Sequence, residues 1–137
     1  MLSPLPNDNI LDANGNISRT WNNWLNNLKN LVNFGESAQN VDVTADQGIS
    51  VISNKMRIQS VTSGAITITR DPQISAGFDG QFLHLEGRDD VKTVQLDNGK
   101  GLKLKGAASF VVGNNDVIML HYNAAKSLWI EDYRSDN

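Results

Sequence analysis

The chain has 137 residues, no cysteine and a formal net charge of −3. These values fit one domain, exclude disulfides and thiolate metal sites, and lack the basic excess typical of nucleic-acid-binding proteins. No apolar run approaches the ~18 residues of a membrane-spanning helix, and the first residues show no signal-peptide pattern. We therefore expect assembly in the cytoplasm, without a nucleic-acid or membrane partner.

Residues 1–17 predict an extended N-terminal arm, because prolines and clusters of Asn, Asp and Gly exclude a helix there. The segment has too few apolar residues for a core of its own. It could lie as an arm on another surface, which Leu2, Leu5, Ile10 and Leu11 would contact. A disordered tail is the alternative interpretation.

Residues 18–34 predict a short amphipathic helix. Ser18 is a suitable N-cap, and Gly35 lies where a C′ glycine belongs. Apolar residues recur at steps of four and three, the spacing of a coiled-coil seam. This helix seam consists of Ile17, Trp21, Trp24, Leu28 and Leu31. Asparagines fill the opposite face and disfavour an isolated helix, so we expect the seam to pack against other copies or against the chain's own β-domain.

From about residue 41 the hydrophobic period changes to two, which is typical of strands with one buried face. Short alternating segments follow one another, with turn residues between them. They are 66–69, 82–86, 93–96, 102–105, 117–122 and 128–131. The pattern predicts a mainly β domain over residues 35–137, an antiparallel β-sandwich of jelly-roll type. The pair Asn98-Gly99 predicts a type I′ hairpin turn.

The segment 117–122 differs from the others because it is apolar on both faces. One face can enter the core. The other, which carries Val117 and Met119, also needs cover, and we expect a second subunit to supply it. Cover by the helix or by a second sheet of the same chain is the alternative.

Residues capable of chemistry form no recognisable catalytic motif. His84 and His121 lie in strand segments beside leucine, where a packing role is expected. A Ser109-His121-Asp116 set can be assembled on paper, but no nucleophile elbow supports it. The run from Asp12 to Asn16 begins like a calcium loop and then lacks the required Gly and Glu. We predict no catalytic residue, no metal site and no cofactor, and we expect the protein not to be an enzyme.

Two parts of the sequence carry a family resemblance. The first is residues 6–15 with Thr20-Trp21-Asn22-Asn23-Trp24-Leu25, and the second is Val94-Gln95-Leu96-Asp97-Asn98-Gly99-Lys100-Gly101-Leu102 with residues 115–120 and 128–131. The first resembles the N-terminal arm and helix of short bacteriophage virion proteins, and the second resembles the β-module of phage fibre and head-decoration proteins. The resemblance implies a homotrimer on the virion surface, attached through its arm and helix, with no catalytic residues.

The resemblance does not extend to the distal tip domain of receptor-binding fibres, which favours a capsid decoration or cement protein, or a short head fibre. The implied partners are further copies of the chain and phage capsid or tail proteins, with a host surface glycan as a further candidate. A tail-fibre or adaptor segment is one alternative. Another is a carbohydrate-binding module in which Phe82, Tyr122 and Trp129 stack on sugars.

Overall fold

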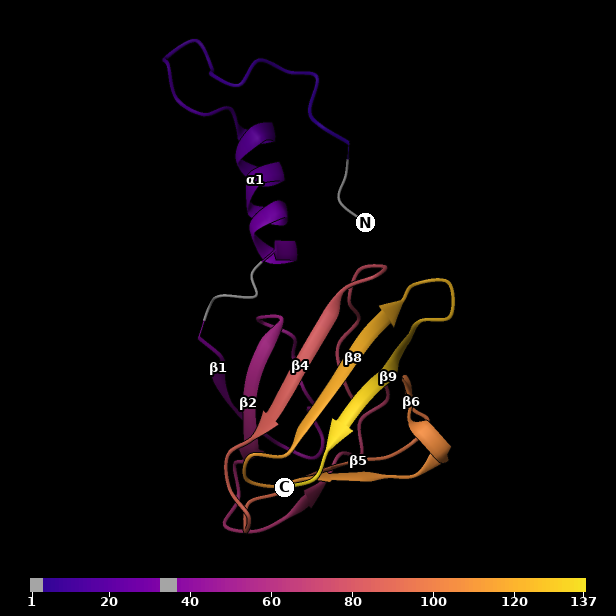
Figure 1. Ribbon diagram of the computed structural model, residues 1–137. Helices are drawn as coiled ribbons and strands as arrows, with labels where there is room; N and C mark the ends of the chain where they lie inside the picture. The colour runs from indigo at the N-terminus through magenta and orange to yellow at the C-terminus, as the bar shows by residue number, and fades with distance from the viewer. Residues whose placement is uncertain (1–3, 33–36) are drawn as a thin grey trace.

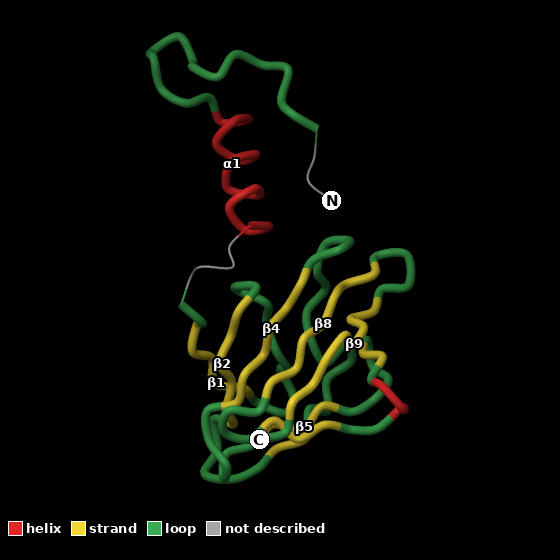
Figure 2. The backbone as a smooth tube through the Cα atoms, in the orientation of Figure 1, coloured by secondary structure: helices red, strands yellow, loops and turns green. Residues whose placement is uncertain are grey.

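The computed structural model describes residues 4–32 and 37–137, without the side chains of residues 29–32. Its elements, shown in Figures 1 and 2, are a helix, nine strands and a 3₁₀ turn. They are α1 (Arg19–Val32), β1 (Gln39–Val43), β2 (Lys55–Ser60), β3 (Ile66–Thr67), β4 (Phe82–Gly87), β5 (Val94–Leu96), β6 (Leu102–Lys103), η1 (Lys105–Ala107), β7 (Phe110–Val112), β8 (Val117–Asn123) and β9 (Leu128–Ser135). The prediction of a mainly β chain with one helix is confirmed.

Two sheets enclose the core. The larger has the order β1-β2-β4-β8-β9-β6 and the smaller has the order β3-β5-β7. In Figure 1 the larger sheet faces the viewer, and β5 lies at its lower end. Among the described strand pairs, four are parallel and three are antiparallel. The prediction of an antiparallel jelly roll is therefore wrong, because alternation reveals which face of a strand is buried but not the direction of its neighbour.

The parallel pairs arise because the chain winds back over itself. Ile49 lies beside Ile74, β2 pairs with β4, and β3 pairs with β5, all in parallel. Residues 49–67 are thus stacked on residues 74–96 along their length. Parallel neighbours need long crossover connections, commonly a helix. Here the connection from β2 to β4 carries β3 of the smaller sheet, and the connection from β3 to β5 carries β4 of the larger sheet. Both sheets therefore grow together as this part of the chain winds.

The core lies between the sheets, and among the described residues it is formed by side chains of the β-domain. Its buried apolar residues are Val43, Ile49, Met56, Ile58, Ile68, Ile74, Leu83, Leu85, Val94, Leu96, Leu102, Leu104, Phe110, Val112, Ile118, Leu120, Tyr122 and Trp129. Trp129 is the largest fully buried side chain, at 1% exposure. Its Nε1 donates to the carbonyl of Ser75 at 2.9 Å, and its ring centroid lies 5.0 Å from that of Tyr122. A Cβ on Gly77 would lie 2.7 Å from the Trp129 ring, so only glycine fits there.

Helix α1 and the arm stand beyond the end of the larger sheet (Figure 1), and none of their described side chains belongs to the core. The helix begins after Ser18, as predicted, since the Ser18 carbonyl accepts from the Asn22 amide at 2.9 Å and its Oγ lies 3.5 Å from the Trp21 amide nitrogen. The predicted C′ residue Gly35 lies outside the described residues. Within this structure the helix covers neither sheet.

The arm is not fully extended, which corrects the prediction. Leu11 and Ile17 form an antiparallel bridge around a turn, and the Ser18 amide donates to the Ile10 carbonyl at 2.7 Å. The Asp12 carboxylate explains the turn, because its Oδ1 accepts from the backbone amides of Asn14 and Asn16 at 2.8 and 3.0 Å. Residues 10–18 therefore form a hook closed at the start of α1.

The predicted hairpin turn lies two residues further along the chain. Gly99 and Leu102 exchange backbone hydrogen bonds of 2.8 and 3.0 Å, and Lys100 and Gly101 between them have φ of 47° and 79°. Two successive positive φ values define a type I′ loop. Asn98 has a different role, since its Oδ1 accepts from the Leu104 amide at 2.9 Å.

Candidate functional site

The helix seam lies at the surface of the chain. Trp21 and Trp24 meet edge to face with ring centroids 5.8 Å apart, and they are half-buried, as is Leu28. Ile17 precedes the helix and is 47% exposed. The predicted seam residue Leu31 lies in α1, but its side chain is outside the described residues. The four described seam residues thus leave an apolar stripe that the chain's own β-core does not cover.

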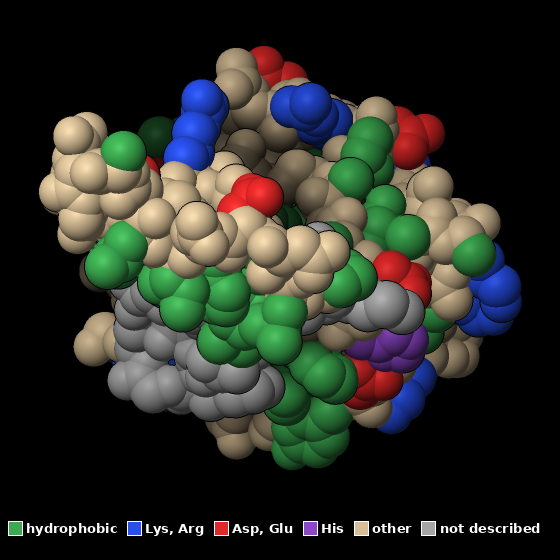
Figure 3. Space-filling model, turned by 90° about the horizontal axis from the view of Figure 1, so that it is seen from above, with side chains coloured by type: hydrophobic (Ala, Val, Ile, Leu, Met, Phe, Trp, Pro, Cys, Tyr) green, Lys and Arg blue, Asp and Glu red, His purple; other side chains and the backbone are tan. Residues whose placement is uncertain are grey.

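The arm contacts this seam through a backbone carbonyl of its own. The indole Nε1 of Trp21 donates to the carbonyl oxygen of Asp8 at 2.8 Å, which holds the arm against the helix. The apolar side chains predicted for attachment remain at the surface. They are Leu5, Ile10 and Leu11, with exposures of 62%, 55% and 53%. Figure 3 views the molecule from the end that carries the arm and helix, and hydrophobic side chains form a band across the centre of that face.

The outward face of the six-stranded sheet forms a second apolar surface. Strand β8 alternates strictly, so Ile118, Leu120 and Tyr122 are buried while Val117 and Met119 point outward and are half-buried. The strand registers place Tyr133 of β9 opposite Met119, and they place Glu86 and Ser135 on either side of Val117. Further apolar side chains lie along the same strands, with Phe82 and Ile130 on either side of His121 and Leu128 opposite Asn123. In Figure 1 neither α1 nor the smaller sheet lies over this face, so no described element covers Val117 and Met119.

The other half of the outward face is charged. On it Arg57 of β2 pairs with Glu86 of β4 at 3.3 Å, and Asp42 of β1 pairs with Arg88 at 3.0 Å. Lys55 lies opposite His84 across the β2–β4 pair. We call the part of the face over β1, β2 and β4 its ionic half and the part over β8 and β9 its apolar half. The apolar half also holds the contact between His121 and Asp132, and Phe82 of β4 borders it.

The two histidines have different surroundings. His121 Nδ1 lies 2.9 Å from both carboxylate oxygens of Asp132, at the surface. His84 Nδ1 is buried and has no hydrogen-bond partner among the described residues. Burial, followed by the charge of Lys55, lowers the pKa of His84 below its ordinary value. A neutral His84 between β2 and β8 fits the packing role expected for it.

The Ser-His-Asp set considered from the sequence is not brought together. Ser109 Oγ donates to Asp97 at 2.8 Å, and His121 contacts Asp132. The Asp116 carboxylate accepts from the backbone amides of Gly113 and Asn137. Among the described residues, no group of three or more His, Asp or Glu side chains could hold a metal ion.

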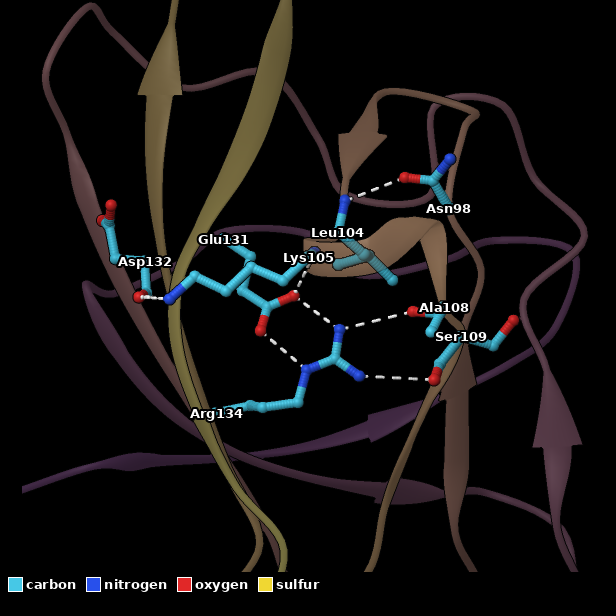
Figure 4. A network of polar contacts seen from close by, with 8 residues as sticks. All are labelled: Asn98, Leu104, Lys105, Ala108, Ser109, Glu131, Asp132 and Arg134. Carbon is cyan, nitrogen blue, oxygen red and sulfur yellow. Dashed lines mark hydrogen bonds and ion pairs between the residues drawn. The ribbon is translucent and has the colours of Figure 1, made fainter.

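A polar network that sequence reasoning missed ties β9 to the segment after β6 (Figure 4). The Glu131 side chain has no exposed surface and receives two hydrogen bonds from the Arg134 guanidinium, at 2.6 and 2.5 Å. It also accepts from the Lys105 amide at 2.8 Å. Arg134 donates to the carbonyls of Ala108 and Ser109 and lies over the Phe110 ring at 4.8 Å.

This network lowers the pKa of Glu131, chiefly through the hydrogen bonds from Arg134, and raises the pKa of Arg134. Both charges are thus satisfied inside the protein, which is the arrangement of a structural lock rather than of an acid–base pair. In the sequence, only the spacing of Glu131 and Arg134 in the C-terminal strand could have indicated this ion pair. That spacing is a weak indication without the tertiary contacts.

Comparisons with known proteins identify no family. No protein-family model matches the chain, and no curated protein matches it in sequence. One solved structure, described as "Structure of a chaperone-substrate complex", aligns with a TM-score of 0.43 at 14% identity over 73% of this chain and 19% of the other. The chain thus spans about a fifth of the length of that structure's chain. In the described parts of the sequence, no helix is both long enough and apolar enough to cross a membrane.

Proposed function

We propose that this chain is a non-enzymatic structural subunit of a bacteriophage particle, a homotrimer assembled through the helix seam. It decorates or cements the capsid, or forms a short head fibre. The observation that carries the proposal is that α1 stands away from the β-core with Trp21, Trp24 and Leu28 at the surface. The assignment to a phage rests on the sequence resemblance alone.

The energetics favour self-association. An Asn-rich helix of 14 residues is marginal alone, so its stability must come from packing. Transfer of a large apolar side chain from water into a packed interface contributes about 1.5–3 kcal/mol. Because the step of three and four residues repeats along α1, parallel copies of the helix bury the same seam residues against one another.

The apolar half of the outward sheet face supports a second contact between subunits. Val117 and Met119 are half-buried there, and Tyr133 lies beside Met119. A neighbouring β-domain would complete the burial of these side chains. The exposed apolar residues of the arm then remain for attachment to the particle. They are Leu5, Ile10 and Leu11.

The structure removes most of the basis for a carbohydrate-binding module built on aromatic side chains. Tyr122 and Trp129 are core residues, at 7% and 1% exposure. Of the three aromatic residues considered from the sequence, Phe82, at 49% exposure, is the one whose ring could stack on a sugar. The tail-fibre or adaptor alternative shares the same self-association and differs in location on the particle.

Antibodies against the β-domain, applied to purified particles of the parent phage and imaged by electron microscopy, test the proposal. Label on the head supports decoration or cement, and label on the tail supports the adaptor alternative. If the infected cells produce the chain but the purified particles carry no label, a structural role on the virion is contradicted.

A further inference from the structure

A polar hollow of about 270 Å³ opens on the ionic half of the outward sheet face. It is lined by side chains from three adjacent strands and from the turn between β7 and β8. They are Asn40, Arg57, Glu86, Arg88, Asn114 and Asn115. A volume near the lower end of the range for small-molecule sites admits one small ligand rather than an extended chain.

The fold places these side chains in fixed positions. Asn40 of β1 is the register partner of Arg57 on β2, and Arg57 is the partner of Glu86 on β4, so the three form a row on one face. The turn is fastened to β4 at Gly87, where a Cβ would lie 1.7 Å from the Gly113 carbonyl oxygen. This close approach brings the β7–β8 turn to the edge of the row.

Hydrogen bonds hold the turn in place without using its amide side chains. The Asn115 backbone amide donates to the Gly87 carbonyl at 3.1 Å, and the Asn114 backbone amide donates to Asp90 Oδ1 at 2.8 Å. Within the described residues, the side-chain amides of Asn40, Asn114 and Asn115 make no hydrogen bond. Three amide groups, each a donor and an acceptor, therefore line the hollow with free capacity.

The charges of the hollow are balanced. Each arginine already has an acidic partner, since Arg57 contacts Glu86 at 3.3 Å and Arg88 contacts Asp42 at 3.0 Å. An incoming anion would have to compete with these carboxylates. The unused recognition capacity belongs to the amides, which suit neutral hydroxyl groups.

A larger hollow, of about 480 Å³, lies beside Asp90, Asp116 and Arg134 and lacks this property. Asp116 accepts from two backbone amides, Asp90 accepts from a third, and Arg134 is held by Glu131. Three of its four charged side chains are thus committed to the fold, and the fourth, Asp136, is an exposed carboxylate near the C-terminus. The smaller hollow is therefore the better ligand site.

We propose that the hollow between β1, β2, β4 and the β7–β8 turn binds a single neutral sugar unit. The amides of Asn40, Asn114 and Asn115 would donate to and accept from its hydroxyl groups. Because no aromatic ring lines the hollow, the affinity for one unit is expected to be low, with a Kd of about 1–10 mM. The site lies within one β-domain, so it does not depend on self-association, although several copies in one assembly would raise the avidity for a surface.

Titration of the ¹⁵N-labelled full chain, followed by the NMR signals of the asparagine side-chain amides, tests the site. The probes are glucose, galactose, mannose and N-acetylglucosamine, with N-acetylneuraminate as the anionic comparison. We expect saturable shifts of the Asn40, Asn114 and Asn115 side-chain signals with at least one neutral sugar. We also expect Asn114→Ala to raise the Kd for that sugar about tenfold, because the variant loses the hydrogen bonds of one side-chain amide.

The matched control is Asn26→Ala, which removes an equally exposed asparagine from α1 and should leave the Kd unchanged. Melting curves of both variants show that each remains folded. Saturable binding of N-acetylneuraminate in preference to every neutral sugar would overturn the assignment to neutral ligands. The absence of saturable shifts with all five probes, or equal binding by Asn114→Ala and the wild type, would overturn the site itself.

Discussion

Trp21 of α1 and Asp8 of the arm are joined by a hydrogen bond of 2.8 Å from the indole Nε1 to the backbone carbonyl oxygen. The bond couples two segments that the sequence presents as separate, an arm for attachment and a helix for self-association. Because it uses a carbonyl of the arm, it leaves the apolar side chains of Leu5, Ile10 and Leu11 exposed. The arm can therefore be altered chemically without loss of its contact with the helix.

This separation gives the first prediction. The triple change Leu5→Ser, Ile10→Ser, Leu11→Ser keeps the backbone bonds of the arm, so the melting temperature and the mass of the assembly should not change. Attachment to phage particles, measured by co-sedimentation, should fall because the apolar contacts are lost. Full occupancy of particles by the triple variant would show that the arm is not the attachment element.

A second prediction concerns the buried pair of Glu131 and Arg134. Arg134→Ala leaves a carboxylate with no exposed surface and without its cation, which typically costs about 3–5 kcal/mol in the free energy of unfolding. The control is Arg57→Ala, whose partly exposed pair with Glu86 should contribute no more than about 1 kcal/mol. Denaturant unfolding of the two variants compares them, and equal losses would refute the structural role of the network.

The same pair has a pH signature. Since the folded state lowers the pKa of Glu131, its contribution to stability is complete above the ordinary glutamate pKa and is lost as the pH falls through the lowered value. A variant without the charge of Glu131 should therefore show a smaller decrease in the free energy of unfolding as the pH falls below the ordinary glutamate pKa.

Much of the β-domain could be predicted from sequence because a half-buried strand alternates. The segments around β4, β8 and β9 were identified this way, with the buried face of β8 correctly assigned. Strand β2 carries the same signal in Met56 and Ile58, between polar neighbours, and was not singled out. Pairing direction was missed, since the stacking of residues 49–67 on 74–96 depends on contacts between distant residues.

The candidate surfaces were predictable to different degrees. The seam follows from residue spacing alone, and Trp21, Trp24 and Leu28 lie on one side of α1 as expected. The lock around Arg134 was not predictable, because its partners Ala108 and Ser109 come from a loop far away in sequence. The hollow beside Asn114 was not predictable either, because it depends on the close approach of Gly87 to Gly113, which are distant in the sequence.

A third prediction concerns the pH dependence of His84. Because its pKa is lowered in the folded state, the unfolded chain binds a proton more readily. The free energy of unfolding should be largest above the ordinary histidine pKa of ~6.5 and should fall as the pH drops from there toward the lowered pKa. His84→Gln should be less sensitive over that window, as measured by melting temperatures from pH 7.5 to 5. Identical pH profiles would contradict this assignment.

A fourth prediction tests the apolar half of the sheet face. Met119→Lys places a charge on the outward face of β8 and leaves the core-facing side chains of that strand unchanged. The β-domain of the full chain should therefore stay folded. Self-association should weaken, because a contact with a second subunit would bury the ammonium group. Thr67→Lys, at an exposed position of β3 on the other sheet, is the control. Equal association by both variants would restrict the interface to α1.

The central claim is that α1 holds three copies together through its seam. Sedimentation equilibrium of the full chain should give about three times the 15.0 kDa chain mass. The double change Trp21→Ala, Trp24→Ala removes side chains whose burial is typically worth about 3–5 kcal/mol each, so the mass should fall toward that of one chain while the circular dichroism of the strands persists. A wild-type chain that sediments as a monomer at micromolar concentration, or a double variant that remains trimeric, would contradict the account.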